Sequence, residues 1–222
     1  MRSFTDRKEA GELLAQAINE HLSQMHQLAP ENPNILVLAL PRGGVPVAAP
    51  VAQKLGAELD LMIVRKLGLP WHPELAMGAI TTGDIRILND DVISMNGVTD
   101  NEIEQVEQRE KLELARRESA YRQDRPLPSI QDRTIILVDD GIATGATMLA
   151  AIEGVRRQHP KEILVGTPVA PAVVVEDLKR KVDAVICLST PIDFYAIGRW
   201  YNDFSQTTDE EVHQLLGEAW HT

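Results

Sequence analysis

Residues 138–148 of this 222-residue chain read VDDGIATGATM, and this stretch decides the fold. The apolar run Ile135–Leu137 precedes it, and a helix-forming segment from Met148 to Arg157 follows. A buried strand therefore ends at two adjacent carboxylates, and a loop of small and hydroxyl residues leads into a helix. Carboxylates suit paired sugar hydroxyls, and the N–H groups at a helix N-terminus suit a phosphate, so the stretch can hold a phosphorylated sugar.

The same stretch also has a purely structural interpretation. Asp-Gly after a strand is a common turn, and Thr or Gly near a helix start is a common cap. The combination of Asp139 and Asp140 with the run Thr144–Thr147 favours the binding interpretation. No Lys follows Gly145, so the loop is not a P-loop.

The order of apolar residues, two acids, a short spacer and Ala-Thr-Gly-x-Thr resembles a motif of type I phosphoribosyltransferases, which binds 5-phosphoribosyl 1-diphosphate (PRPP). The resemblance implies that the two acids accept hydrogen bonds from the ribose 2- and 3-hydroxyls and that the loop holds the 5-phosphate. The chain as a whole looks like a poorly characterised subgroup of the family. The PRPP-binding residues implied are Asp139, Asp140, Gly141, Ala143, Thr144, Gly145, Ala146 and Thr147.

A second loop with glycines, Pro41-Arg42-Gly43-Gly44, follows the apolar run 35–40. Glycines let the backbone come close to a ligand, and Arg can meet a phosphate through two N–H groups. In isolation, a strand-to-helix turn with a solvated Arg is the simpler interpretation. The resemblance instead implies a diphosphate-binding loop formed by Arg42, Gly43 and Gly44.

Arg65 and Lys66 come directly after the expected strand 59–64, which is apolar except for Asp60. Alone, they read as solvated charges in a loop, whereas the resemblance implies that both contact the diphosphate. It also implies that residues 67–77 form a flexible loop that closes over the site. The catalytic residues implied are Asp139, Asp140 and Lys66.

Five of the nine aromatic residues lie between positions 194 and 204. Aromatic faces bind flat heterocycles well, but such a cluster can equally anchor the end of the chain by packing. Both interpretations stay open; the resemblance implies Phe194, Tyr195 and Tyr201 as contacts of an acceptor base. The segment does not match the base-binding signatures of the adenine, hypoxanthine-guanine, orotate or uracil enzymes, so the acceptor is not identified.

Apolar runs alternate with helix-forming segments along most of the chain. This order predicts an α/β fold with a parallel central sheet, helices on both faces and ligands at the carboxyl ends of the strands. With the resemblance, it predicts one phosphoribosyltransferase domain over residues 1–222. We expect a polar helical arm at 99–122 and a small C-terminal or inserted hood at 191–222. The expected strands are 35–40, 59–64, 78–81, 85–88, 134–138, 162–167 and 183–188.

Composition narrows the setting and the partners. The formal net charge of −11 argues against nucleic-acid binding, which normally needs a basic face. The single cysteine, Cys187, cannot form an internal disulfide and fits a reducing, cytoplasmic setting. The charged first nine residues lack the apolar core of a signal peptide, and no apolar run reaches membrane-spanning length. We expect a cytoplasmic protein without a membrane partner.

The resemblance implies a Mg²⁺-dependent enzyme that transfers the 5-phosphoribosyl group of PRPP to a nitrogenous base and releases diphosphate. Mg²⁺ is expected to bind mainly through PRPP, with Asp139 and Asp140 as the candidate protein ligands. Because family members are commonly dimers, a homodimer is expected.

Two alternatives to this enzyme stay open. One is a non-catalytic PRPP-binding regulator of a protein partner; the other is an unrelated α/β phosphatase with Asp139 as nucleophile, against which the spacing of Thr144 and Thr147 argues.

Overall fold

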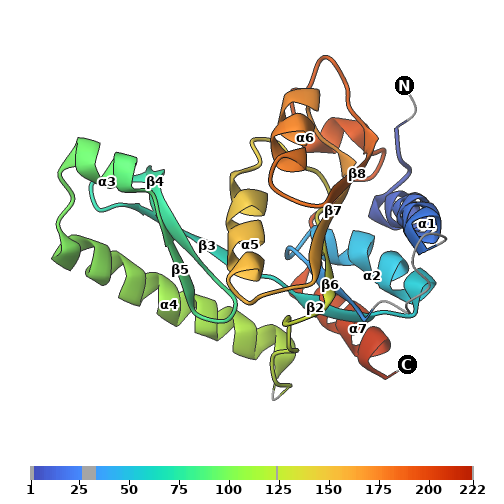
Figure 1. Cartoon of the computed structure of the whole chain (residues 1–222), viewed down its shortest axis with the longest axis horizontal. Helices are drawn as coiled ribbons and strands as arrows, with labels where there is room; N and C mark the ends of the chain where they lie inside the picture. Colours follow the sequence, from blue (N-terminus) through green and yellow to red (C-terminus); the bar gives the residue numbers. More distant parts are fainter. Residues whose placement is uncertain (1–2, 27–33, 124, 222) are drawn as a thin grey trace.

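The computed structural model describes residues 3–26, 34–123 and 125–221. A five-stranded sheet forms the centre, in the order β2-β1-β6-β7-β8, and every neighbouring pair is parallel (Figure 1). All carboxyl ends of these strands therefore meet at one edge. The strands are β1 (Ile35–Ala39), β2 (Glu58–Leu61), β6 (Thr134–Val138), β7 (Glu162–Val169) and β8 (Ala184–Ser189).

Helices cover both faces of the sheet, as the sequence predicts. Because successive strand residues point to opposite faces, Val37 and Ala39 join one apolar cluster, and Leu36 and Leu38 join another. The first cluster includes residues of α1 and α2, and the second includes residues of α5 and α6. These helices are α1 (Arg7–His26), α2 (Gly44–Leu55), α5 (Ala146–Arg156) and α6 (Ala172–Lys179).

Residues 64–122 extend away from the central sheet (Figure 1). This whole segment, which includes the helix expected at 99–122, is called the arm from here on. A three-stranded antiparallel sheet in the order β3-β4-β5 packs against a long helix, α4. The helix ends where expected, and Thr99 and Glu102 form a capping box at its start. The elements of the arm are β3 (Val64–Leu69), β4 (His72–Thr81), β5 (Ile85–Leu88), α3 (Asp90–Asn96) and α4 (Asp100–Arg122).

The expectation of a loop over residues 67–77 is wrong, because these residues belong to the hairpin of β3 and β4. Leu67, Leu69 and Met77 are fully buried and hold the hairpin in the core. The register shifts on either side of Gly68, which packs against the Pro73 backbone. The Gly and Pro residues therefore mark a bulge in a strand pair and not a loop.

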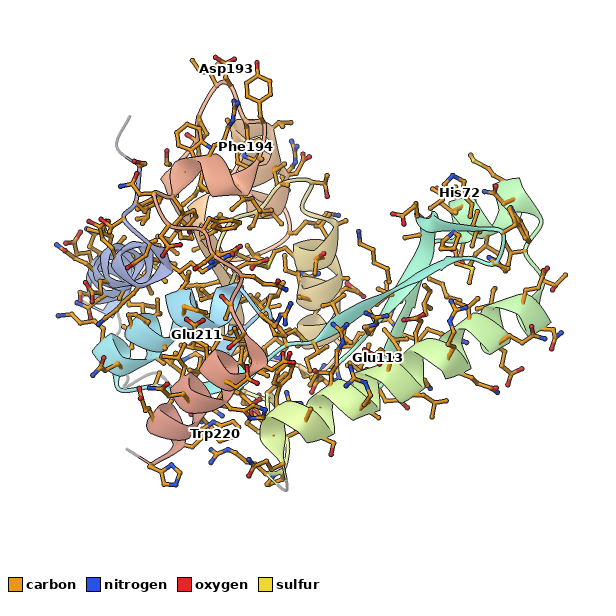
Figure 2. The ribbon with its side chains drawn as sticks, turned by 180° about the vertical axis from the view of Figure 1, so that it is seen from behind. His72, Glu113, Asp193, Phe194, Glu211 and Trp220 are labelled. Carbon is orange, nitrogen blue, oxygen red and sulfur yellow. The ribbon has the colours of Figure 1, made fainter. Side chains whose placement is uncertain are left out.

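The C-terminal segment divides into two parts, whereas one hood over 191–222 is expected from the sequence. Residues 190–208, with the short 3-10 helix η1 (Ile197–Trp200), follow the carboxyl end of β8. Helix α7 (Asp209–Trp220) instead packs against α2 and β2, because its apolar residues Val212 and Leu216 are buried in the first core cluster. Figure 2 shows Trp220 and Phe194 at opposite ends of the body. Within the described ranges, no helix has both the length and the apolar character needed to cross a membrane.

Candidate sugar-phosphate site

The two loops that the sequence analysis identifies separately lie side by side in the structure. The Leu40 N–H donates to the Val138 carbonyl at 2.9 Å, so the glycine loop (residues 41–44) and the motif loop (residues 139–145) leave the sheet together. A Cβ on Gly44 would lie 2.7 Å from the Val138 carbonyl oxygen, and one on Gly43 would overlap the Asp140 carboxylate. The close contact of the loops thus requires both glycines.

The acid pair sits where the two loops meet. The Asp140 N–H donates to Oδ1 of Asp139 at 2.9 Å, and Asp140 is only 8% exposed. Burial, and then the charge of Asp140, raises the pKa of Asp139 well above its usual range. Burial also raises the pKa of Asp140, while Arg7 opposes this rise. A cation beside the pair therefore favours its charged form.

The rest of the motif loop presents a backbone surface to solvent at the start of α5. Gly145 caps the helix in the left-handed region, at φ +79°, and the Ala146 N–H of the first turn donates to Oγ1 of Thr144 at 3.5 Å. Ala143, Thr144, Ala146 and Thr147 are exposed. The first N–H groups of a helix have no intrahelical partner, and the dipole there favours an anion, so this end of α5 can bind a phosphate.

Contacts from three other segments fix the motif loop. The Ile142 N–H donates to the Val169 carbonyl at 2.9 Å, at the end of β7. A Cβ on Gly141 would overlap Ile197 of η1, and one on Gly145 would lie 3.1 Å from Cγ1 of Val174 in α6. The loop is therefore held in shape before any ligand binds, which lowers the entropy cost of binding.

Arg42 is engaged with a different element. Its Nη1 lies 3.5 Å from Oδ1 of Asp209, the first residue of α7, and the peptide bond between Pro41 and Arg42 is cis. The Gly44 N–H donates to the Leu40 carbonyl at 3.0 Å, so in this arrangement it is not available to a ligand. Diphosphate binding by this loop stays a prediction. It would require Arg42 to give up its contact with Asp209 and to contact the ligand instead.

Arg65 and Lys66 lie on β3 and not in a loop. Nη2 of Arg65 lies 2.5 Å from Oε2 of Glu110 on α4, so this guanidinium holds the arm together. Lys66 is exposed and forms no ion pair with the described residues. Lys66 thus remains the candidate for an anion contact.

The three aromatic residues expected to contact a base have different environments. Tyr195 is 76% exposed and Phe194 is half-buried. Tyr201 is 6% exposed, its ring packs against Phe4 and Phe204, and its hydroxyl donates to the Asp140 carbonyl at 2.5 Å. Tyr201 therefore supports the acid pair and offers no open face for stacking.

Arg7, at the start of α1, was missed by the sequence analysis. Its Nε lies 2.7 Å from Oδ2 of Asp140, although 133 positions separate the two residues in the chain. No local pattern distinguishes Arg7 from other charged residues near a helix start. Only the way that α1 packs against the sheet reveals it.

Fold and site together define an α/β protein whose parallel sheet carries an acid pair and a helix N-terminus at its carboxyl edge, where ligands of such folds bind. The family model of the phosphoribosyl transferase domain matches residues 6–198. The chain therefore belongs to this family, which confirms the expectation drawn from the motif.

Similar proteins agree with this assignment. The chain is 42% identical over 219 residues to two Mycobacterium tuberculosis proteins, named "Putative phosphoribosyl transferase" MT0597 (strain CDC 1551) and Rv0571c (strain H37Rv). The match covers 99% of this chain and 47% of each relative, so the chain spans about half the length of the curated relatives it matches. The crystal structure of TT1426 from Thermus thermophilus is 42% identical, with a TM-score of 0.81, over 98% of this chain and 99% of that chain.

Proposed function

We propose that this protein transfers the 5-phosphoribosyl group of PRPP to a nitrogenous base and releases diphosphate. One observation carries the proposal: the N-terminus of α5 lies directly beside two carboxylates, buried Asp140 and half-buried Asp139, and a glycine loop. The α5 end suits the 5-phosphate, and Asp139 and Asp140 suit the ribose hydroxyls. Arg42 and the glycine loop would take the diphosphate.

In the proposed reaction, the bond between ribose C1 and the diphosphate oxygen breaks, and its electron pair leaves with the diphosphate. A base nitrogen forms the new bond to C1 and loses its proton. Positive charge develops on the ring during the transfer, and negative charge on the acid pair would stabilise that state. The motif loop contributes by holding the ring in a fixed position relative to the acceptor.

Mg²⁺ fits this site as a cation shared between protein and substrate. Among the described residues, no group of three or more His, Cys, Asp or Glu side chains is placed to hold a metal ion. Asp139 and Asp140 offer two carboxylates, and Mg²⁺ in proteins commonly uses one or two carboxylates together with substrate phosphates. When bound, the ion would neutralise the departing diphosphate.

The test measures diphosphate release from PRPP with Mg²⁺ and a panel of purine and pyrimidine bases. We expect turnover with at least one base and a loss of about 100-fold or more in Asp140→Asn, because a preorganised charge at the site is removed. Asp177→Asn changes an exposed carboxylate on α6 and should keep full activity.

Two negative outcomes have different meanings. If the wild-type protein binds PRPP but no base supports turnover, the catalytic proposal fails and a PRPP-binding regulator of a protein partner is favoured. If calorimetry with Mg²⁺ present detects no PRPP binding, both readings fail.

A further inference from the structure

Residues 3–5, at the start of the described chain, meet residues 200–203 beside the acid pair. The Phe4 N–H donates to the Trp200 carbonyl and the Asn202 N–H donates to the Phe4 carbonyl, both at 2.8 Å. Phe4 and Tyr201 form a parallel bridge, and their rings lie 5.5 Å apart. Residues 3–5 thus form a short strand-like contact with residues 200–203, and α1 begins directly after it.

This contact places Arg7 between the C-terminal segment and the acid pair. Besides its bond to Asp140, the Arg7 side chain donates from Nη1 to the Ser205 carbonyl at 2.7 Å. Its guanidinium lies 3.9 Å from the centre of the Phe204 ring. The side chains of Arg7 and Asp140 are only 12% and 11% exposed, so water screens their interaction weakly.

The Arg7 contacts leave one atom of Asp140 for a ligand. Oδ2 accepts from Arg7 and faces Gly43, whereas Oδ1 has no hydrogen-bond partner among the described residues. The Asp140 carbonyl is held by the Tyr201 hydroxyl. The backbone and the side chain of Asp140 are therefore both fixed by residues that are distant in the sequence, Tyr201 and Arg7.

We propose that Arg7 is the positioning residue of the ribose site: it fixes the Asp140 carboxylate so that Oδ1 faces the sugar hydroxyls. This inference rests on the proposed function, since it names how that site is held in shape. Arg7 acts through Asp140 and is not expected to touch the substrate.

The chemistry of the contacts requires Arg at this position. A guanidinium donates through Nε and Nη1 in fixed directions and can stack on an aromatic ring at the same time. A Lys ammonium keeps the charge but is not planar. It therefore cannot stack on the Phe204 ring while it also donates to both Asp140 and Ser205. Arg7→Lys should therefore fold and still lose ligand affinity.

The test is calorimetric titration with PRPP and Mg²⁺, and then with ribose 5-phosphate and 2-deoxyribose 5-phosphate. We expect Arg7→Ala to weaken PRPP binding about 10-fold or more, and Arg7→Lys to recover only part of that loss. The preference for ribose over 2-deoxyribose 5-phosphate should shrink in both variants. Lys8→Ala, which changes the exposed neighbour on α1, should bind like the wild type.

A double-variant cycle separates positioning from general stability. If Arg7 acts through Asp140, then Arg7→Ala added to Asp140→Asn should cause little further loss of PRPP affinity. Equal losses from Arg7→Ala in both backgrounds, or an unchanged sugar preference, would overturn the inference. If the wild-type protein binds PRPP and the Arg7 variants bind it equally well, only the role of Arg7 is refuted. If the wild-type protein does not bind PRPP, the proposed function itself is refuted.

Discussion

Gly43 and Asp140 come from loops that follow different strands, and they are packed so closely that no side chain fits between them. A Cβ on Gly43 would overlap Oδ2 of Asp140, the same atom that accepts from Arg7. The position of the acid is therefore set from two sides, by the glycine loop and by α1. Substitutions in the glycine loop or at Arg7 should therefore alter ligand affinity by moving the Asp140 carboxylate.

Gly43→Ala should weaken PRPP binding about 10-fold or more, because the methyl group must displace the Asp140 carboxylate. Calorimetric titration with Mg²⁺ present measures the effect. Gly217→Ala is the matched control, since a Cβ at Gly217 of α7 meets no atom within 4 Å and Ala favours a helix. Unchanged affinity in Gly43→Ala would contradict the proposed arrangement of the loops.

Tyr201→Phe should destabilise the protein by about 1–2 kcal/mol. The substitution keeps the ring but removes the hydroxyl that donates to the buried Asp140 carbonyl, which is then left without this partner. Urea unfolding measures the change in the free energy of unfolding. The exposed Tyr195, changed to Phe, should shift that free energy by less than about 0.5 kcal/mol. Equal effects of both substitutions would refute the assigned role.

Tyr121→Phe should raise the pKa of Asp209 towards its usual value. The Tyr121 hydroxyl donates to Oδ1 of Asp209 at 2.6 Å and is the main cause of the lowered pKa of Asp209; the Arg42 charge also lowers it. A lowered carboxyl pKa stabilises the fold above the unfolded value, about pH 3.9, and this stability is lost as the pH falls through the folded value. Carboxyl NMR titration of both proteins gives the pKa of Asp209. An unchanged pKa would mean that the hydrogen bond is not formed in solution.

Arg122→Met should destabilise the protein by about 3–5 kcal/mol. Arg122 and Asp60 form an ion pair at 2.7 Å with side chains that are 3% and 0% exposed, so the substitution leaves a buried carboxylate without its cation. Asp60→Leu combined with Arg122→Met should recover most of that loss in urea unfolding. The exposed Arg116, changed to Met, serves as the control. No recovery in the double variant would indicate that the pair acts through packing alone.

Local sequence patterns predicted the parts of the fold that depend on near neighbours in the chain. The strand at residues 134–138, the helix that follows it and the acid pair between them all lie within one short segment. The glycine loop was predicted in the same way. The loop expected over residues 67–77 came from the resemblance to the family and not from a local pattern, and buried Leu67 and Leu69 hold these residues in a hairpin instead.

The sequence by itself determined the family, the parallel α/β sheet and the two loops at its carboxyl edge, because each follows from a run of adjacent residues. Only the tertiary structure decided what surrounds Asp140. Arg7 and Tyr201 lie 133 and 61 positions away in the chain, and they reach Asp140 because the order of the strands and the contact between Phe4 and Tyr201 bring them there. No local pattern carries that information, since it depends on how distant segments pack.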